Sequence, residues 1–223
     1  MSGDLESLIV QTWNFDDPAG SATAFAALAD HAGSVADAIV LRTQQARAIG
    51  LGGDFRSAAE LLDECDRFLS VVDDGVGTEH AAARIAIERG RVRGSTEDAA
   101  GARPLFERAR ALSLAAGLPG LALDALHMLA IVAGDLDGPA AAMTINRQGI
   151  AEAQASSDPA ATRWLGSLLN NLGADLFDVG RPADALPVFE QALQARIDAG
   201  QTDRVAEAKA AIDEVRIALG SAG

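Results

Sequence analysis

Apolar side chains recur along this chain with the period of an α-helix. Between short runs of glycine, proline and aspartate, they are spaced three and four positions apart rather than two. This pattern predicts helices at about residues 3–13, 20–32, 34–50, 54–72, 78–93, 99–116, 119–133, 139–155, 159–179, 182–199 and 202–219. No segment alternates as a half-buried strand does, so we expect an all-α chain of about eleven helices joined by short loops.

Residues that favour helix ends mark several of these boundaries. Proline follows a turn residue at positions 18, 139, 159 and 182, where its fixed backbone angle suits the first turn of a helix. Ser34 precedes Asp37 by three residues, which is similar to a capping box. Gly117 and Gly200 lie where helices are expected to end.

A trio of small, large and small residues recurs on the second helix of four successive helix pairs. Its members are spaced i, i+4, i+7, and the trios begin 44, 40 and 43 residues apart. The trios are Ala58–Leu62–Cys65, Ala102–Phe106–Ala109, Ala142–Asn146–Gly149 and Ala185–Phe189–Ala192. Small residues let two helices approach closely, and the large residue fills the groove of the next pair. Because one pair cannot bury its apolar face alone, the pairs are expected to stack into a solenoid.

The last of these repeats resembles the tetratricopeptide-repeat family. That pattern has a large residue, Leu-Gly, another large residue, a turn glycine, and then a small, an aromatic and a small residue. The matching positions here are Leu169, Leu172, Gly173, Leu176, Gly180, Ala185, Phe189 and Ala192. The adjacent Asn170 and Asn171, with a period above 40, are similar to the long-repeat subtype of kinesin light chains and to bacterial single-domain repeat proteins. The resemblance implies a right-handed α-solenoid of four to five antiparallel helix pairs.

The resemblance also implies how the chain is organised. Residues 34–199 would form four repeats, residues 1–33 a degenerate leading helix pair and residues 202–219 a capping helix, in a single domain over 1–223. Repeat two is expected to have a longer turn, from Gly94 to Gly101. Repeat three departs at Asn146, where an aromatic is expected, so this amide either has buried partners or faces a cavity.

In this family the first helix of each pair lines a concave surface. Carrying that register over places on this surface Thr43, Gln44, Arg47, Arg84, Glu88, Arg91, Asp124, His127, Asn170 and Asn171, with Arg163 at its edge. Independently of the resemblance, Arg84, Glu88 and Arg91 are spaced i, i+4, i+7 and must share one helix face. Arginine binds carboxylates and phosphates through two parallel hydrogen bonds, and asparagine amides can fix a peptide backbone. Trp13 and Trp164 are either recognition aromatics or packing residues.

The overall charge has the opposite sign to these arginines. The chain has a formal net charge of −14 and lacks the basic footprint of a nucleic-acid-binding protein. Arginines in the groove of such an acidic molecule favour an acidic or carboxylate-bearing ligand, and some tetratricopeptide domains hold a peptide's terminal carboxylate in this way. The alternative is that Arg84 and Arg91 pair with Glu88 and neighbouring acids along a solvated face.

The sequence contains no recognisable catalytic, cofactor or metal motif. It has no GxSxG or Walker motif, and the glycines at 50–54 fall at a turn between helices. The three histidines are far apart in sequence, and Asp135 and Asp137 lack the rest of a calcium loop. Cys65 occupies a small packing position and is expected to be an inert buried thiol. No catalytic residue, metal or cofactor is therefore assigned.

The apolar residues give no sign of a membrane protein. No apolar run approaches the roughly 18–20 residues that cross a bilayer, and the first residues, MSGDLESL, do not resemble a signal peptide. A cytoplasmic protein is expected, and its oligomeric state is left open.

Three functions are compatible with these features. The leading interpretation is a non-catalytic module that binds a protein or peptide segment, acidic or C-terminal, in its concave groove. The first alternative is a sensor or enzyme for an anionic small molecule, with a pocket closed by the amino-terminal helices. The second alternative is a structural homo-oligomer.

Overall fold

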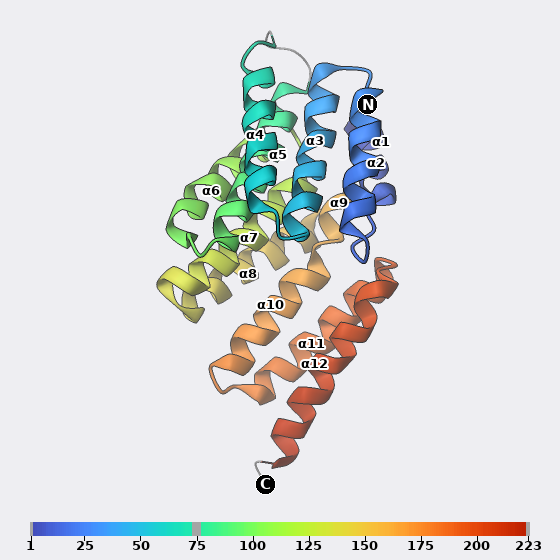
Figure 1. Ribbon diagram of the computed structural model, residues 1–223. Helices are drawn as coiled ribbons and strands as arrows, with labels where there is room; N and C mark the ends of the chain where they lie inside the picture. The colour runs from blue at the N-terminus through green and yellow to red at the C-terminus, as the bar shows by residue number, and fades with distance from the viewer. Residues whose placement is uncertain (1, 73–76, 222–223) are drawn as a thin grey trace. The chain divides into compact units, whose positions relative to one another are not determined.

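The computed structural model describes residues 2–72 and 77–221, which form helices and contain no strand (Figure 1). The helices are α1 (Ser2–Thr12), α2 (Pro18–Asp30), α3 (Val35–Leu51), α4 (Phe55–Leu69), α5 (Thr78–Ser95), α6 (Ala99–Ala115), α7 (Pro119–Asp137), α8 (Pro139–Ala155), α9 (Pro159–Thr162), α10 (Leu165–Asp178), α11 (Pro182–Asp198) and α12 (Thr202–Ser221). The predicted all-α repeat fold is therefore confirmed.

Helix contacts divide the chain into two compact units, residues 1–118 and 119–223. In the first unit α3 pairs with α4, α5 pairs with α6, and α2 packs along α3. In the second unit α7 pairs with α8, α10 pairs with α11, and α12 packs on α11. Both units thus consist of helix pairs, and the single domain over 1–223 stays a prediction.

Side chains cap the predicted helix starts. Each capping oxygen accepts a hydrogen bond from a backbone N–H in the first turn, which would otherwise have no partner. The residues that cap in this way are Asp17, Ser34, Asp54, Asp98 and Asp158. The short polar residues before the helices therefore determine where they begin.

One predicted helix, at 159–179, is broken into α9 and α10. The backbone N–H of Trp164 donates to the carbonyl of Ala161, three residues back, at 3.0 Å. This tighter hydrogen bond interrupts the α-helical ladder. Helix α9 also lies very close to α7. A Cβ added to Gly120 of α7 would be only 2.7 Å from the backbone carbonyl oxygen of Ala160 of α9.

The small and large residues of the repeated trios are buried. In the second helices α4, α6 and α11 the central residue is Leu62, Phe106 or Phe189, and each is at most 4% exposed. In two helix pairs, α5–α6 and α10–α11, the ring of the central phenylalanine packs against a glycine of the first helix. A Cβ on Gly90 would lie 2.5 Å from the ring of Phe106, and one on Gly173 would lie 2.9 Å from that of Phe189. These glycines allow the two helices of each pair to approach closely.

Asn146 replaces the aromatic residue in the third trio. It is buried, and its side-chain N–H donates to Asp175 Oδ2 at 2.9 Å, whereas its own oxygen is buried without a hydrogen bond. Burial raises the pKa of Asp175, and this effect outweighs the hydrogen bond from Asn146, which lowers it. The structure thus gives this amide one partner, the half-buried Asp175, and leaves its oxygen without one.

The turn of repeat two is no longer than those of repeats one and four, contrary to expectation. Helix α5 continues to Ser95 and α6 begins at Ala99, so three residues connect them, as at 52–54 and 179–181. The middle residue of these turns has a positive φ, 90° at Gly53, 77° at Gly180 and 61° at Glu97. Glu97 thus adopts a left-handed conformation that costs a side-chain-bearing residue about 1–2 kcal/mol.

Replacing Glu97 with glycine is expected to raise the free energy of unfolding by about 0.5–1 kcal/mol, because glycine adopts a positive φ without this steric cost. The Glu97 side chain is exposed, so few contacts are lost. Urea denaturation measures the change. As a control, Gly53→Ala should lower stability by about 1 kcal/mol, because its Cβ would meet nothing within 4 Å and only the backbone effect remains. A less stable Glu97→Gly variant would contradict the assigned conformation.

Helix α7 corrects the expectation that no segment is long and apolar enough to span a membrane. Its 19 residues have a mean hydropathy of 1.3, so by length and composition this helix is long and apolar enough to cross a membrane. Yet 61% of this stretch is buried inside the protein, and it contains the buried Asp124. Leu123 and Leu126 on α7 belong to the core of the second unit. The helix thus has the features of a core helix in a folded domain.

The cysteine has the expected surroundings. Cys65 on α4 is buried among apolar residues of α1, α2, α3 and α5. This burial raises the pKa of its thiol to about 11. The thiol form therefore predominates at neutral pH, which fits an unreactive packing residue.

Candidate functional site

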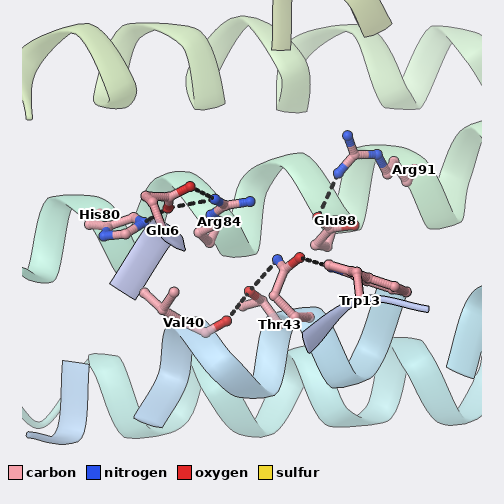
Figure 2. Close-up of polar contacts among 9 residues, drawn as sticks. Glu6, Trp13, Val40, Thr43, His80, Arg84, Glu88 and Arg91 are labelled. Carbon is pink, nitrogen blue, oxygen red and sulfur yellow. Dashed lines mark hydrogen bonds and ion pairs between the residues drawn. The ribbon is translucent and has the colours of Figure 1, made fainter. Parts of the chain in front are cut away.

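Helix α5 carries a row of charged residues in the interior of the first unit (Figure 2). Arg84, Glu88 and Arg91 follow one another at the predicted spacing of one helix face. Arg84 and Glu88 are buried, and the Arg91 side chain is 15% exposed. His80 extends the row by one turn and is also buried. We call these four residues the α5 stripe.

The amino-terminal helix supplies a carboxylate to the α5 stripe. Glu6 of α1 points at Arg84, whose Nη2 lies 2.6 Å from Oε1 and 2.5 Å from Oε2 (Figure 2). The Nε2 atom of His80 lies 2.9 Å from the same carboxylate. Two groups one helical turn apart on α5 therefore face one carboxylate, Arg84 through hydrogen bonds and His80 at ion-pair distance.

These contacts change the acidity of Glu6. Burial by itself would raise the pKa, but the charge of Arg84 and the hydrogen bonds from His80 and Arg84 outweigh it and lower the pKa from 4.5 to about 2. A carboxylate with a lower pKa in the folded state stabilises that state above its unfolded pKa. This contribution is lost as the pH falls from about 4.5 towards 2.

We therefore expect Glu6 to titrate near pH 2 in the folded protein. Replacing Arg84 with methionine should raise the pKa of Glu6, because burial remains while the main opposing charge is lost. A ¹³C NMR titration of the glutamate side-chain carboxyl carbons in both proteins measures this shift. A Glu6 carboxyl that titrates at its ordinary pKa in the unmodified protein would contradict the ion pair.

Arg91 and Glu88 form a second ion pair on the α5 stripe. Arg91 Nη1 lies 2.5 Å from Glu88 Oε1, while Glu88 Oε2 is buried and has no hydrogen-bond partner. The arginines thus pair with acids, as the alternative interpretation of the sequence expects. The face that carries these pairs is largely buried, however, whereas that interpretation expects it to be solvated.

In the same unit, polar residues of α3 contact an aromatic cluster from the segment between α1 and α2. Gln44 is buried and accepts a hydrogen bond from Trp13 Nε1 at 3.1 Å. Its side-chain nitrogen lies 3.4 Å from the hydroxyl of Thr43, which in turn donates to a backbone carbonyl of α3 (Figure 2). Arg47 lies over the stacked rings of Trp13 and Phe15, 5.4 and 5.7 Å from their centres. Trp13 thus links the segment after α1 to α3.

The second unit brings together other predicted residues from α7 and α10. Asn171 Nδ2 lies 3.1 Å from His127 Nδ1, and the His127 ring is 5.4 Å from that of Trp164. The neighbouring Asn170 is partly exposed, although its side-chain oxygen is buried without a hydrogen bond. This group combines two amides, an imidazole and an aromatic ring, which can contact both the backbone and the side chains of a peptide.

The second unit also contains two further predicted residues, Asp124 and Arg163. Asp124 is buried in α7. Arg163 lies in the turn between α9 and α10, is partly exposed, and accepts a hydrogen bond at its backbone oxygen from Gln201 at 3.0 Å. The predicted concavity joins residues of both units and stays a prediction.

Sequence reasoning missed Glu6 as a partner of the α5 stripe. Glu6 and Arg84 are 78 residues apart, so no local spacing connects them. His80 is likewise absent from the residues that the sequence places on this face. It lies four residues before Arg84, and this i, i+4 spacing could have placed it on the same face.

Among residues 2–72 and 77–221 there is no group of three His, Cys, Asp or Glu side chains that could bind a metal ion. A shallow hollow of about 50 Å³ lies between α4, α5 and α6, with Arg89 and Arg108 in its lining. Small-molecule sites occupy roughly 300–1,000 Å³.

Comparison with known proteins identifies the repeat. Residues 165–199, which contain α10 and α11, match a family model described as tetratricopeptide repeat. The segment that forms α10 and α11 is therefore similar to a tetratricopeptide repeat. Its resemblance to this family was predicted from the same segment of sequence.

Solved structures of similar repeat proteins share the fold of this chain. The crystal structure of BtubC (BKLC) from P. vanneervenii is 20% identical, with a TM-score of 0.68 over 97% of this chain and 84% of that chain. A putative kinesin light chain from Podospora anserina with nearly identical TPR-like repeats is 14% identical, with a TM-score of 0.53 over 83% of this chain and 97% of that chain. No curated protein matches the sequence. Tetratricopeptide repeats generally mediate protein–protein interaction, so the expected class of partner is a protein.

Proposed function

We propose that this protein is a cytoplasmic, non-catalytic recognition module that binds an acidic or carboxylate-bearing segment of a partner protein. The binding surface would be formed by the first helices of the pairs, with the α5 stripe as the position for the acidic group. The observation that carries this proposal is the carboxylate of Glu6, held by Arg84 and His80. The stripe therefore has the chemistry and geometry to bind a carboxylate.

The residues on the first helices have complementary roles in this proposal. An arginine side chain offers a planar array of N–H donors that matches a carboxylate, which supports roles for Arg84, Arg91 and Arg47. Amide groups both donate and accept hydrogen bonds, as a peptide backbone does, which supports roles for Asn170 and Asn171.

Replacing Arg91 with alanine is expected to weaken binding of an acidic peptide about tenfold, or by about 1.5 kcal/mol, the lower end of the range for hydrogen bonds to charged groups. Arg91→Lys should restore only part of the affinity, because an ammonium group cannot form the paired hydrogen bonds of a guanidinium. Fluorescence anisotropy with a labelled eight-residue peptide of Glu, Asp and Gly measures both effects. The same peptide with Lys in place of its acids tests the sign of the charge.

Arg56→Ala is the matched control. Arg56 is exposed on α4, a second helix, and pairs with Glu60 at 2.9 Å, so its loss should leave peptide affinity unchanged. Equal weakening by Arg56→Ala and Arg91→Ala would mean that only the overall charge matters and would contradict the site. Calorimetry with succinate separates the alternatives, because binding of succinate without binding of the peptide would favour a small-molecule sensor.

A further inference from the structure

Helix α1 lies on the α5 stripe in the manner of a bound ligand. Its Glu6 carboxylate takes the position that the proposed function assigns to a partner's acidic group. On either side of Glu6 in the sequence, Leu5 and Ile9 are buried in a core with Val40 of α3 and Ile85 of α5. Leu5, Glu6 and Ile9, together with the partly buried Leu8, therefore place acidic and apolar contacts of α1 within about one helical turn.

Helix α1 is a weak helix by itself. It has 11 residues, and isolated helices shorter than about 12–15 residues are marginal in water. Its outer residues Ser7, Val10 and Gln11 are exposed, so one side of the helix provides its tertiary contacts. The docked position thus depends on a few side chains, with the Glu6 ion pair among them.

The segment after α1 is fixed independently of the helix. Trp13 donates a hydrogen bond to Gln44 and packs edge-on against Phe25, with ring centres 5.2 Å apart. The backbone N–H of Asn14 donates to the hydroxyl of Ser21 at 2.9 Å. These contacts would hold residues 13–14 in place if α1 moved away, so residue 12 is a natural limit for the moving part.

We propose that the face beneath α1 binds an acidic amphipathic helix of a partner protein, and that α1 is its built-in competitor. This inference rests on the proposed function and names the form of its ligand. The partner helix would carry an acidic residue with apolar residues one position before it and three positions after it, as Leu5, Glu6 and Ile9 do. Binding would begin with the departure of α1, which exposes Arg84 and His80.

The first test measures the release of α1 in the full chain without any ligand. Glu6→Gln keeps the shape of the side chain but removes its charge, so α1 should open more often. We expect hydrogen–deuterium exchange of the α1 amides to become about tenfold faster or more, with α2–α6 unchanged. The control is Glu60→Gln, an exposed acid paired with Arg56 on α4, which should leave α1 exchange as it was.

The second test supplies a helix in trans. A labelled synthetic peptide with the sequence of residues 2–12 should bind Glu6→Gln about tenfold tighter than the unmodified chain, because the competing helix is displaced for more of the time. The same peptide with Gln in place of its glutamate should bind more weakly. Arg84→Met should abolish the preference for the acidic peptide, since it removes the cation that the glutamate contacts.

Several results would overturn the inference. Unchanged α1 exchange in Glu6→Gln, or faster exchange spread over α2–α6, would make α1 an integral part of the core. Equal affinity of the peptide for Glu6→Gln and for the unmodified chain would show that α1 does not compete with it. A concentration-dependent dimer of Glu6→Gln in sedimentation would assign the face to α1 of a second copy. Because α1 exchange is measured without ligand, its outcome is separate from the acidic-peptide test of the proposed function.

Discussion

Replacing Phe189 with alanine is expected to lower the free energy of unfolding by about 3–5 kcal/mol, the range for truncating a buried phenylalanine. Phe189 is 4% exposed and contacts α10 at Gly173, where no side chain intervenes. Truncation would remove the apolar contacts of the ring and leave a cavity between α10 and α11. The backbone of two packed helices cannot close such a cavity completely, so most of the loss should persist. Denaturant unfolding monitored by circular dichroism measures the change.

Phe68 provides the matched control for this substitution. It is a phenylalanine on the second helix α4 and is 53% exposed. Phe68→Ala should therefore change stability by about 0.5 kcal/mol or less, as surface substitutions generally do. Similar losses for the two variants would mean that the small–large–small trio has been assigned to the wrong helix face.

Replacing Gly90 with alanine is expected to cost about 2–3 kcal/mol, in the upper part of the usual range for overpacking. The added Cβ would lie 2.5 Å from the ring of Phe106, a distance that requires the ring or the helix to move. The pair α3–α4 suggests a compensating change. There Ala46 and Leu62, which correspond to Gly90 and Phe106, pack in one core. Adding Phe106→Leu to Gly90→Ala should therefore recover much of the lost stability, and thermal unfolding of the two single variants and the double variant measures this coupling.

Gly94 tests whether the effect comes from the ring contact. It is on the same helix, and a Cβ there would meet nothing within 4 Å. Gly94→Ala should raise stability by about 0.5–1 kcal/mol, because alanine is the better helix former. A Gly90→Ala variant that is as stable as Gly94→Ala would contradict the close approach of α5 and α6.

Local signals explain why most of the fold could be predicted. A capping residue such as Ser34 acts within its own first turn, and the period of apolar residues identifies each helix face. Two errors have causes outside local sequence. The helix predicted at 159–179 is interrupted where α9 approaches Gly120 of α7, and Glu97 occupies a turn position that glycine takes in other repeats.

The candidate site was predictable to the extent that one helix determines it. The spacing of Arg84, Glu88 and Arg91 correctly places them on one face of α5. Their partners depend on which distant segment reaches that face. Glu6 comes from the amino-terminal helix, 78 residues before Arg84, and its contact could not be derived from spacing. The ion pairs and the burial of the stripe therefore required the structure.

Hydrogen–deuterium exchange with and without the acidic peptide tests the central claim most directly, because it maps where an acidic segment binds. The account predicts slower exchange in the first helices that carry the contacts, above all in α5 and α3, and little change in the second helices α4 and α6. It also predicts that Arg91→Ala reduces this protection at equal peptide concentration. Protection confined to the second helices, or equal protection in Arg91→Ala, would contradict the claim that the α5 stripe binds the acidic segment.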